Sequence, residues 1–103
     1  MDLKKEIEMR FDESNLRNLK LGQKVCTHRS SQRGERGDWF IADGVMYVIL
    51  DVWGRTLVKI REDFFHLEGF ETPDEFEADH RSRHNGEFDC DEFRVIHWFA
   101  RIR

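Results

Sequence analysis

Apolar and polar residues alternate near the beginning of the chain, where Ile7, Met9 and Phe11 are separated by Glu8 and Arg10. Alternation with a period of two is typical of a half-buried strand, so a short strand is predicted over residues 7–11. The pattern then changes to a spacing of three, with two leucines on one helical face. A short amphipathic helix is therefore expected after the strand, capped by Asp12 or Ser14 and ended by Gly22.

The chain after this helix favours a second strand over residues 23–29. It is followed by a polar stretch over residues 30–37 that contains two glycines and three charged residues. Such a composition is typical of an exposed loop, and loops of this kind often grip ligands.

The middle of the sequence has the pattern of a β-meander. Aromatic and β-branched residues dominate three segments, 39–41, 46–53 and 56–60, which are separated by the turn pairs Asp43-Gly44 and Gly54-Arg55. Three further strands are therefore predicted here.

Helices and a final strand are expected in the last third of the chain. Residues 62–67 favour a short helix. Thr72, Pro73 and Glu75 form a capping box with proline at the first helical position, so a helix is predicted from there to about His84. The apolar residues of segment 93–102 indicate a long closing strand.

These elements place the protein in the α+β class. We expect a small curved sheet or partial β-barrel of five or six strands, with two or three helices at its ends. The length of 103 residues, of which 39% are hydrophobic, suits one domain with one modest core and leaves no room for a second. Three tryptophans, Trp39, Trp53 and Trp98, are expected in that core, although they could also stack on nucleic-acid bases.

The chain carries no apolar stretch of the kind that a secretory signal or a membrane span requires. A cytoplasmic protein without membrane contact is therefore expected. In that compartment Cys26 and Cys90, whose spacing fits no metal knuckle, are expected to be free thiols.

The charge of the chain is unevenly distributed. The formal net charge is −4, yet six basic residues and one acidic residue lie between residues 17 and 36. Acidic residues gather instead over residues 71–79 and 87–92. One basic face could hold a phosphate-bearing ligand, whereas a solvated helix and loop would have the same composition.

The most informative string is Gly22-Gln23-Lys24-Val25-Cys26-Thr27-His28-Arg29. It places an amine, a hydroxyl and a guanidinium at a predicted junction between helix and strand. Thr27 and Arg29 lie two positions apart and so share a face of the strand, which Lys24 at the junction can also reach. Taken alone, the string would also suit a basic strand edge in water.

This string and several later motifs resemble the ASCH (activating signal cointegrator homology) family, which is related to the PUA RNA-binding fold. The family pattern is a helix, a G-x-K-x-x-T-x-R string, a Gly-Asp pair, a meander, a Glu-Gly-Phe-like turn into a helix, and an aromatic-rich last strand. This chain supplies them in that order, as the string over residues 22–29, Gly37-Asp38, Glu68-Gly69-Phe70, the helix start at residues 72–76, and Val95-Ile96-His97-Trp98-Phe99. The resemblance covers about nine-tenths of the chain and implies a PUA-like fold.

The resemblance implies more than one function. Domains of this family are regarded as RNA-binding modules, with a cleft between barrel and helices. Some members are amidohydrolases that remove the acyl group from acetylcytidine, and others are linked to RNA cleavage. In the hydrolases a Lys and a Thr of the string act with a Glu near the later helix, and these positions fall on Lys24, Thr27 and Glu68. A lysine freed of its proton can activate a threonine hydroxyl, and a carboxylate can orient both groups. Alternatively, Lys24 interacts with a helix end and Thr27 fills a strand position.

The sequence also departs from the family pattern. His28 occupies a position that is often apolar, and the following loop carries Arg33 and Arg36 in addition to Arg29. Arginines suit phosphate contact better than contact with a bare nucleoside, so these four residues are predicted to bind ligand.

A metal site is a weaker alternative. His80 and His84 are four positions apart on the predicted helix, with Cys90, Asp89 or Asp91 as further donors. An exposed helix face with two histidines is the favoured interpretation, and neither a metal nor another cofactor is predicted.

Three function classes follow. The first, which requires the fewest assumptions about the site, is a module that recognises RNA, a nucleotide or a nucleoside in a basic cleft. The second is an amidohydrolase that acts on modified cytidine through Lys24, Thr27 and Glu68. The third is a ribonuclease, or an adaptor that contacts a basic protein partner through the acidic helix over residues 72–79.

Overall fold

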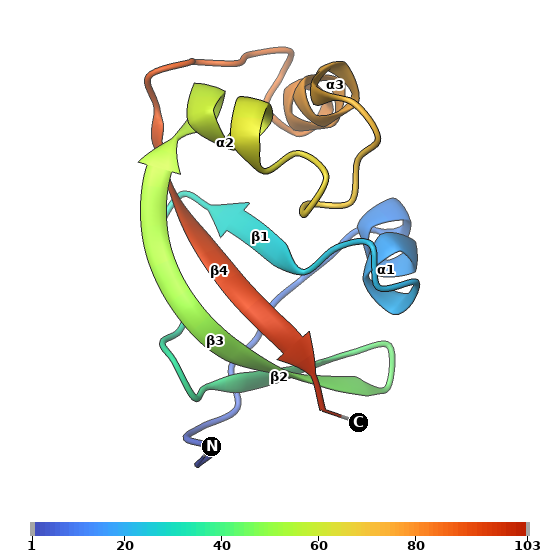
Figure 1. Cartoon of the computed structure of the whole chain (residues 1–103), viewed down its shortest axis with the longest axis vertical. Coiled ribbons are helices and arrows are strands. Elements are labelled where there is room, and N and C mark those ends of the chain that lie inside the picture. The colour runs from blue at the N-terminus through green and yellow to red at the C-terminus, as the bar shows by residue number, and fades with distance from the viewer. Residues whose placement is uncertain (1, 103) are drawn as a thin grey trace.

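The computed structural model describes residues 2–102. One antiparallel sheet of four strands, in the order β1-β4-β3-β2, is flanked by three helices (Figure 1). The elements in chain order are α1 (Glu13–Lys20), β1 (Cys26–Arg29), β2 (Trp39–Ala42), β3 (Val45–Thr56), α2 (Leu57–Asp63), α3 (Pro73–Arg83) and β4 (Phe93–Arg101). The α+β class is therefore confirmed.

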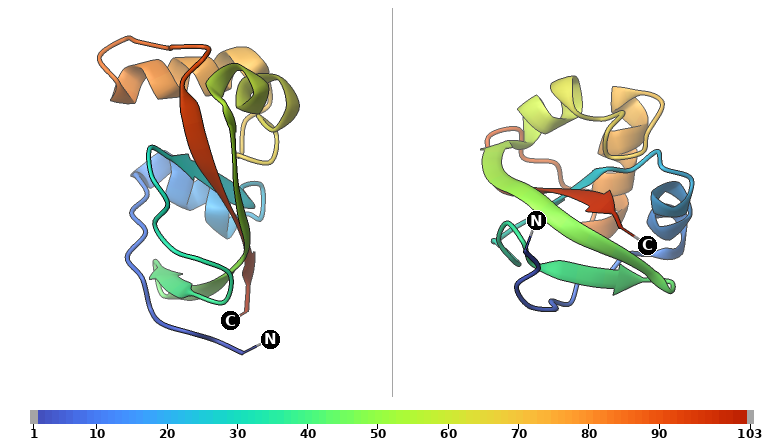
Figure 2. Two further views of the ribbon diagram at one scale, coloured as in Figure 1. Left: turned by 90° about the vertical axis from the view of Figure 1, so that its left-hand side faces the viewer. Right: turned by 60° about the horizontal axis from the view of Figure 1, so that its bottom comes forward.

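The sheet curls because its longest strand bends. The register between β3 and β4 shifts between Ile49 and Asp51, and such a bulge increases local twist. β3 consequently sweeps from the β2 hairpin at one end of the molecule to α2 at the other, and the sheet forms a half-barrel (Figures 1 and 2). Helices α2 and α3 lie together at one end, as Figure 2 shows.

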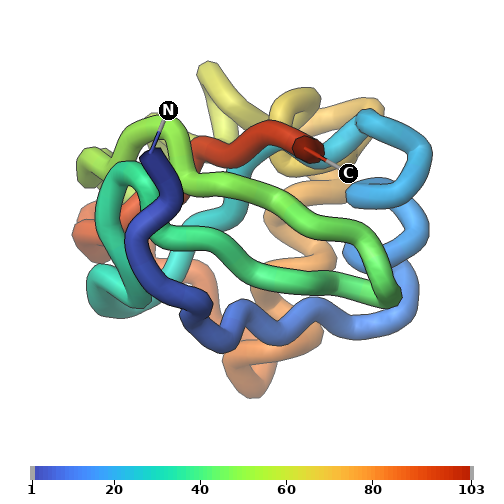
Figure 3. Tube along the Cα trace, turned by 90° about the horizontal axis from the view of Figure 1, so that it is seen from below, coloured from blue at the N-terminus to red at the C-terminus, as the bar shows by residue number. Residues whose placement is uncertain are grey.

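Two of the six predicted strands, over residues 7–11 and 56–60, do not form, so the sheet has four strands rather than five or six. Residues 7–11 run extended beside the β2–β3 hairpin (Figure 3), but among the described residues this part of the chain is joined to the sheet by a single bridge, between the preceding residue Glu6 and Trp39. Beyond that bridge the segment turns toward the cap of α1, so no ladder continues. Its alternation reflects burial of Met9 in the core rather than a strand.

The predicted turn at Gly54-Arg55 is also wrong, because β3 continues to Thr56. Gly54 pairs with Val95 and lies under the ring of Phe93, where an added Cβ would stand 2.1 Å from that ring. The glycine is thus needed for close packing rather than for a turn. The predicted strand over residues 56–60 is helix α2, whose buried Leu57 and Ile60 show a helical spacing of three.

Other local predictions are confirmed. Asp12 caps α1 by accepting a hydrogen bond from the backbone N–H of Asn15. Thr72 caps α3 in the same way from Glu75, with Pro73 at the helix start. The hairpin between β2 and β3 turns at Asp43-Gly44, where both residues have positive φ.

Alternating residues of the sheet feed two apolar clusters. One contains Phe40, Ile49 and Phe99, and the other packs α2 and α3 against Cys26 and Ile96. All three tryptophans are partly buried; Trp53 and Trp98 pack against the second cluster, whereas Trp39 belongs to neither cluster.

Both cysteines are free thiols, Cys26 buried and Cys90 exposed. Within residues 2–102, no helix combines the length and the apolar character that crossing a membrane requires.

Candidate functional site

A cleft of about 530 Å³ opens along β1 and is closed by residues around the start of α1, by the chain before α3, and by α3 itself. β1 is an edge strand of the sheet. Side chains from both of its faces can therefore reach one cleft, and three consecutive residues, Thr27, His28 and Arg29, line it. Lys24 and Glu68 line the same cleft, so the predicted site residues are brought together from opposite parts of the chain.

Lys24 and Glu68 form a buried ion pair. Their side chains are 3% and 2% exposed, and Lys24 Nζ lies 2.8 Å from Glu68 Oε1. The same amine donates to the backbone oxygen of Glu68 at 3.1 Å. The backbones of the two residues also form an isolated antiparallel bridge. Side chains and main chain together therefore fasten the start of β1 to the loop that precedes α3.

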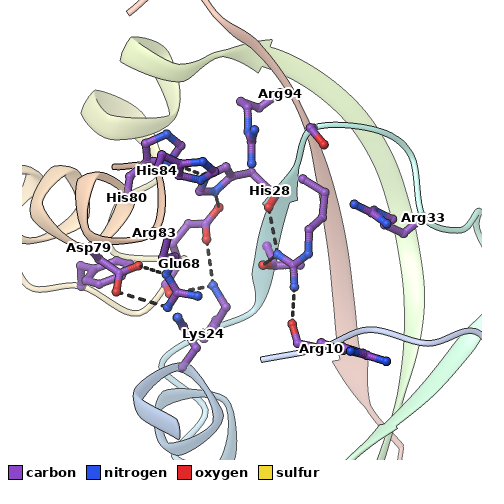
Figure 4. A pocket seen from close by; sticks show the side chains of 15 residues that line it. Arg10, Lys24, His28, Arg33, Glu68, Asp79, His80, Arg83, His84 and Arg94 are labelled. Carbon is purple, nitrogen blue, oxygen red and sulfur yellow. Dashed lines mark hydrogen bonds and ion pairs between the residues drawn. The ribbon is translucent and has the colours of Figure 1, made fainter. Parts of the chain in front are cut away.

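Gly69 makes this close approach possible. Its φ is +105°, a conformation that favours glycine, and an added Cβ would meet Asn18 at 3.0 Å and Lys24 at 3.3 Å. The Glu-Gly-Phe motif thus has a physical role, since its glycine lets the chain turn against α1 while Glu68 points into the cleft (Figure 4).

Glu68 also holds His28. Its Oε2 lies 3.0 Å from His28 Nδ1, so both carboxylate oxygens have a partner. Burial alone would raise the pKa of Glu68, but Lys24 and His28 outweigh burial and lower that pKa to about 2. Glu68 is therefore ionised at neutral pH and accepts the hydrogen bond that His28 Nδ1 donates.

A row of histidines continues from His28. Its Nε2 lies 3.2 Å from His80 Nδ1, and the ring of His80 stacks on that of His84 with centroids 4.0 Å apart. Burial, with His28 and His84 adding to it, lowers the pKa of His80 to about 4. Among residues 2–102, no group of three or more histidine, cysteine, aspartate or glutamate side chains has the geometry to hold a metal ion.

The expectation of an exposed face with two histidines is wrong for His80, which is only 3% exposed. Helix α3 turns this face toward β1, where His28 packs against both His80 and Phe76. The spacing of four was visible in the sequence, but the partner that covers the face lies on β1 and could not be inferred from α3 alone.

Thr27 and Arg29 lie on the other face of β1. The buried Thr27 hydroxyl oxygen accepts a hydrogen bond from the Arg29 guanidinium, as their spacing of two allows. Arg29 also donates to the backbone oxygens of His28 at 2.9 Å and of Arg10 at 2.7 Å. All three acceptors are uncharged. Burial lowers the pKa of Arg29 to about 10, although Glu68 opposes that change.

Arg10, Arg29 and Arg33 form what we call the arginine cluster. All three line the cleft, and Arg10 and Arg33 lie on the opposite side of β1 from Glu68 (Figure 4). Among residues 2–102, neither Arg29 nor Arg33 has an ion-pair partner. Arg36, which was predicted to bind ligand, is exposed and does not line the cleft, because the loop has turned back toward β2 at that point.

Several lining residues were not found from the sequence. Arg10 and Asn15 flank the cap of α1, and Arg83 and Arg94 come from the last third of the chain. Their only signal was residue type. The side chain of Arg94 is 7% exposed and pairs with Glu92 at 2.7 Å.

Comparison with known proteins agrees with this architecture. The crystal structure of an ASCH domain from Lactobacillus crispatus superposes with a TM-score of 0.70 and 18% identity, covering 94% of this chain and 78% of that one. The chain has an ASCH-like fold.

Two further solved structures share this ASCH-like fold. A protein from Enterococcus faecalis, assigned to the DUF984 family model, has a TM-score of 0.60 and 17% identity, covering 99% of this chain and 81% of its own. A hypothetical protein has a TM-score of 0.67 and 15% identity, covering 99% of this chain and 100% of its own. No family model matches the sequence, and no curated protein does.

Protonation of His80 should destabilise the protein in acid. The pKa of His80 is lowered from 6.5 to about 4, so the unfolded chain takes up this proton first as the pH falls. The free energy of unfolding should therefore decrease between those two pH values, by up to about 1.4 kcal/mol per pH unit for this group.

Urea unfolding over this pH range tests the expectation. His80→Gln should reduce the slope, while His66→Gln, at an exposed histidine, should leave it unchanged. An unchanged slope in His80→Gln would mean that His80 is not the group held neutral by burial.

Proposed function

We propose that this protein recognises RNA or a nucleotide through a phosphate group held by the arginine cluster, with the nucleoside in the adjoining cleft. The observation that carries this proposal is Arg29, a half-buried guanidinium whose three acceptors are all uncharged. A buried cation without a carboxylate partner costs free energy, which an anionic ligand would offset.

The charge of the cleft supports an anionic ligand. Its lining includes six arginine and lysine side chains but only two carboxylates, Glu68 and Asp79. Glu68 is paired with Lys24, and Asp79 with Arg83 at 3.0 Å. Arg10 and Arg94 pair with Glu8 and Glu92, which lie outside the lining. Among residues 2–102, the positive charge of the cleft that has no ion-pair partner is therefore that of Arg29 and Arg33, in a chain whose net charge is −4.

The rest of the cleft offers groups of the kind that bind a base or a sugar. His28 and Phe70 provide aromatic rings, and Asn15 and Ser30 provide hydrogen-bonding groups. The oxygen of the Asn15 side chain is buried without a partner among the described residues, so it is an acceptor that a ligand N–H could satisfy.

Arg33 and Arg36 provide a matched pair for a test. Both lie on the same loop, but only Arg33 lines the cleft. Arg33→Gln should weaken binding of a short single-stranded RNA and reduce the slope of log affinity against log salt by about 0.7, the value for one lost phosphate contact. Arg36→Gln should change the slope much less.

The measurement is fluorescence anisotropy of labelled RNA across a salt series. Equal effects of the two variants would contradict the assigned position of the phosphate. Absence of RNA and nucleotide binding by the wild type would remove the proposed function.

A hydrolase is a second candidate, favoured by the buried Lys24–Glu68 pair in the same cleft as Thr27. The Thr27 oxygen accepts from Arg29, which leaves its own hydrogen available to a base. In this reaction the hydroxyl would attack the acyl carbonyl of acetylcytidine, the amide C–N bond would break, and cytidine would leave with the proton on its amine. Water would then hydrolyse the acyl ester on Thr27, which releases the carboxylic acid and restores the hydroxyl. Both hydrogen bonds that the Lys24 amine donates go to Glu68. The amine must lose a proton before it can accept the hydroxyl proton of Thr27 as a general base.

Substitutions at Thr27 distinguish the hydrolase from the binding module. If Thr27 is the nucleophile, Thr27→Val should abolish acetylcytidine turnover while keeping the shape of the side chain, and Thr27→Ser should retain activity. Mass spectrometry of the products is the measurement. An inactive wild type would remove the hydrolase candidate for this substrate, whereas an active Thr27→Val would remove Thr27 as the nucleophile.

The acidic helix was predicted as a surface for a basic protein partner. Several of its carboxylates already pair within the chain, Asp74 and Glu77 with Arg61 and Asp79 with Arg83. A protein partner and RNA cleavage remain predictions from the sequence.

A further inference from the structure

One hydrogen bond ties the loop between β1 and β2 to the middle of the sheet. The backbone N–H of Arg33 donates to His97 Nε2 at 2.9 Å, across 64 positions of sequence. His97 is fully buried in β4, between Thr27 on β1 and Val52 on β3. This contact therefore fixes the backbone of a residue whose guanidinium belongs to the arginine cluster.

The hydrogen bond determines the protonation state of His97. A backbone N–H can only donate, so Nε2 must be free of a proton, and a neutral ring then carries its proton on Nδ1. Protonation of Nε2 would place two N–H groups against each other at 2.9 Å. The contact cannot survive that change.

We propose that His97 is a positioning residue for ligand binding, which holds Arg33 at the cleft while its Nε2 is unprotonated and releases the loop when that nitrogen is protonated. The inference rests on the proposed function, because it concerns the placement of one of the arginines that hold the phosphate.

Burial and the charged groups around His97 keep its ring neutral at neutral pH, so that its hydrogen bond to the Arg33 backbone is kept. Burial lowers the pKa of His97, the backbone carbonyls of Thr27 and Val95 oppose this, and Arg29 and Arg33 add to the lowering. The residue opposite on β3, Val52, is uncharged. The folded protein therefore keeps His97 neutral as the pH falls below the ordinary histidine value, and the contact is lost on further acidification.

Two substitutions distinguish the role of His97 as a hydrogen-bond acceptor from the effect of its protonation. The amide oxygen of His97→Gln can take the place of Nε2 and does not titrate, whereas His97→Leu fills the space without an acceptor. The probe is a fluorescent oligouridylate. At about pH 7.5 the glutamine variant should bind it like the wild type and the leucine variant about tenfold more weakly, as expected for a lost charge-assisted contact.

The pH profile supplies the second readout. As the pH is lowered toward about 5, the wild type should lose affinity relative to His97→Gln, which keeps its acceptor. Comparing these two proteins cancels the titration of His80 and His84, which both retain. Equal pH profiles would overturn the release of the loop by protonation.

A double mutant tests whether His97 affects binding through Arg33 or only through the overall stability of the protein. In an Arg33→Gln background, His97→Leu should cause little further loss of affinity, because the residue that it positions has already lost its charge. An equal loss in both backgrounds would show that His97 acts through overall stability, and would overturn the inference. His66→Leu, at an exposed histidine, is the matched control, and circular dichroism checks that each variant is folded.

A measurement without ligand separates this inference from the proposed function. In ¹⁵N-labelled protein, scalar coupling between the Arg33 amide nitrogen and His97 Nε2 should be present at neutral pH and disappear in acid. Absence of the coupling would overturn the inference even if RNA binds. A wild type that shows the coupling but binds no RNA would remove the proposed function, and with it the role of His97 in binding.

Discussion

The buried ion pair between Lys24 and Glu68 is the interaction on which the rest of the site depends. It joins the start of the edge strand β1 to the loop before α3, and the backbone bridge between the same residues reinforces it. Loss of one partner from a buried pair typically costs about 3–5 kcal/mol, because the other charge is left uncompensated. The pair also determines the state of its neighbours, since the ionised Glu68 holds His28, and His28 in turn contacts His80 on α3. These contacts therefore join β1, the loop before α3 and α3 itself, which together form one wall of the cleft.

The other side of β1 has the opposite property. Arg29 is surrounded by uncharged acceptors, and Arg33 is held by its backbone rather than by a carboxylate. Acidic residues outnumber basic ones in the chain, yet within residues 2–102 no carboxylate pairs with the guanidinium group of Arg29 or Arg33. In the proposed function, the side of β1 whose charges are paired forms one wall of the cleft, and the side with unpaired guanidinium groups attracts the anionic ligand. Successive side chains of β1 point to opposite faces, so neighbouring residues of this edge strand can lie in these two different environments.

Much of this site could be predicted from local sequence. The string over residues 22–29 and the Glu68-Gly69-Phe70 motif identified the charged residues, and the cap at Thr72 located α3. Contacts between distant segments could not be predicted in the same way. His80 is buried because His28 on β1 and Phe88 beyond α3 pack against it. Arg94 reaches the cleft from the last strand, and Gly54 lies in an unbroken strand under Phe93. The strand predicted over residues 7–11 shows the same limitation, since alternation reports burial and not hydrogen-bonded pairing.

The central claim is that an anionic nucleic-acid ligand occupies the cleft along β1, with its phosphate at the arginine cluster. It is tested most directly by titrating ¹⁵N-labelled protein with a short RNA and following the backbone and arginine side-chain resonances. The account predicts that the largest shifts occur at Arg10, Arg29 and Arg33, with smaller ones at His28 and Glu68. Shifts confined to the outer face of α3 or to the β2–β3 hairpin, with the arginine cluster unchanged, would contradict it.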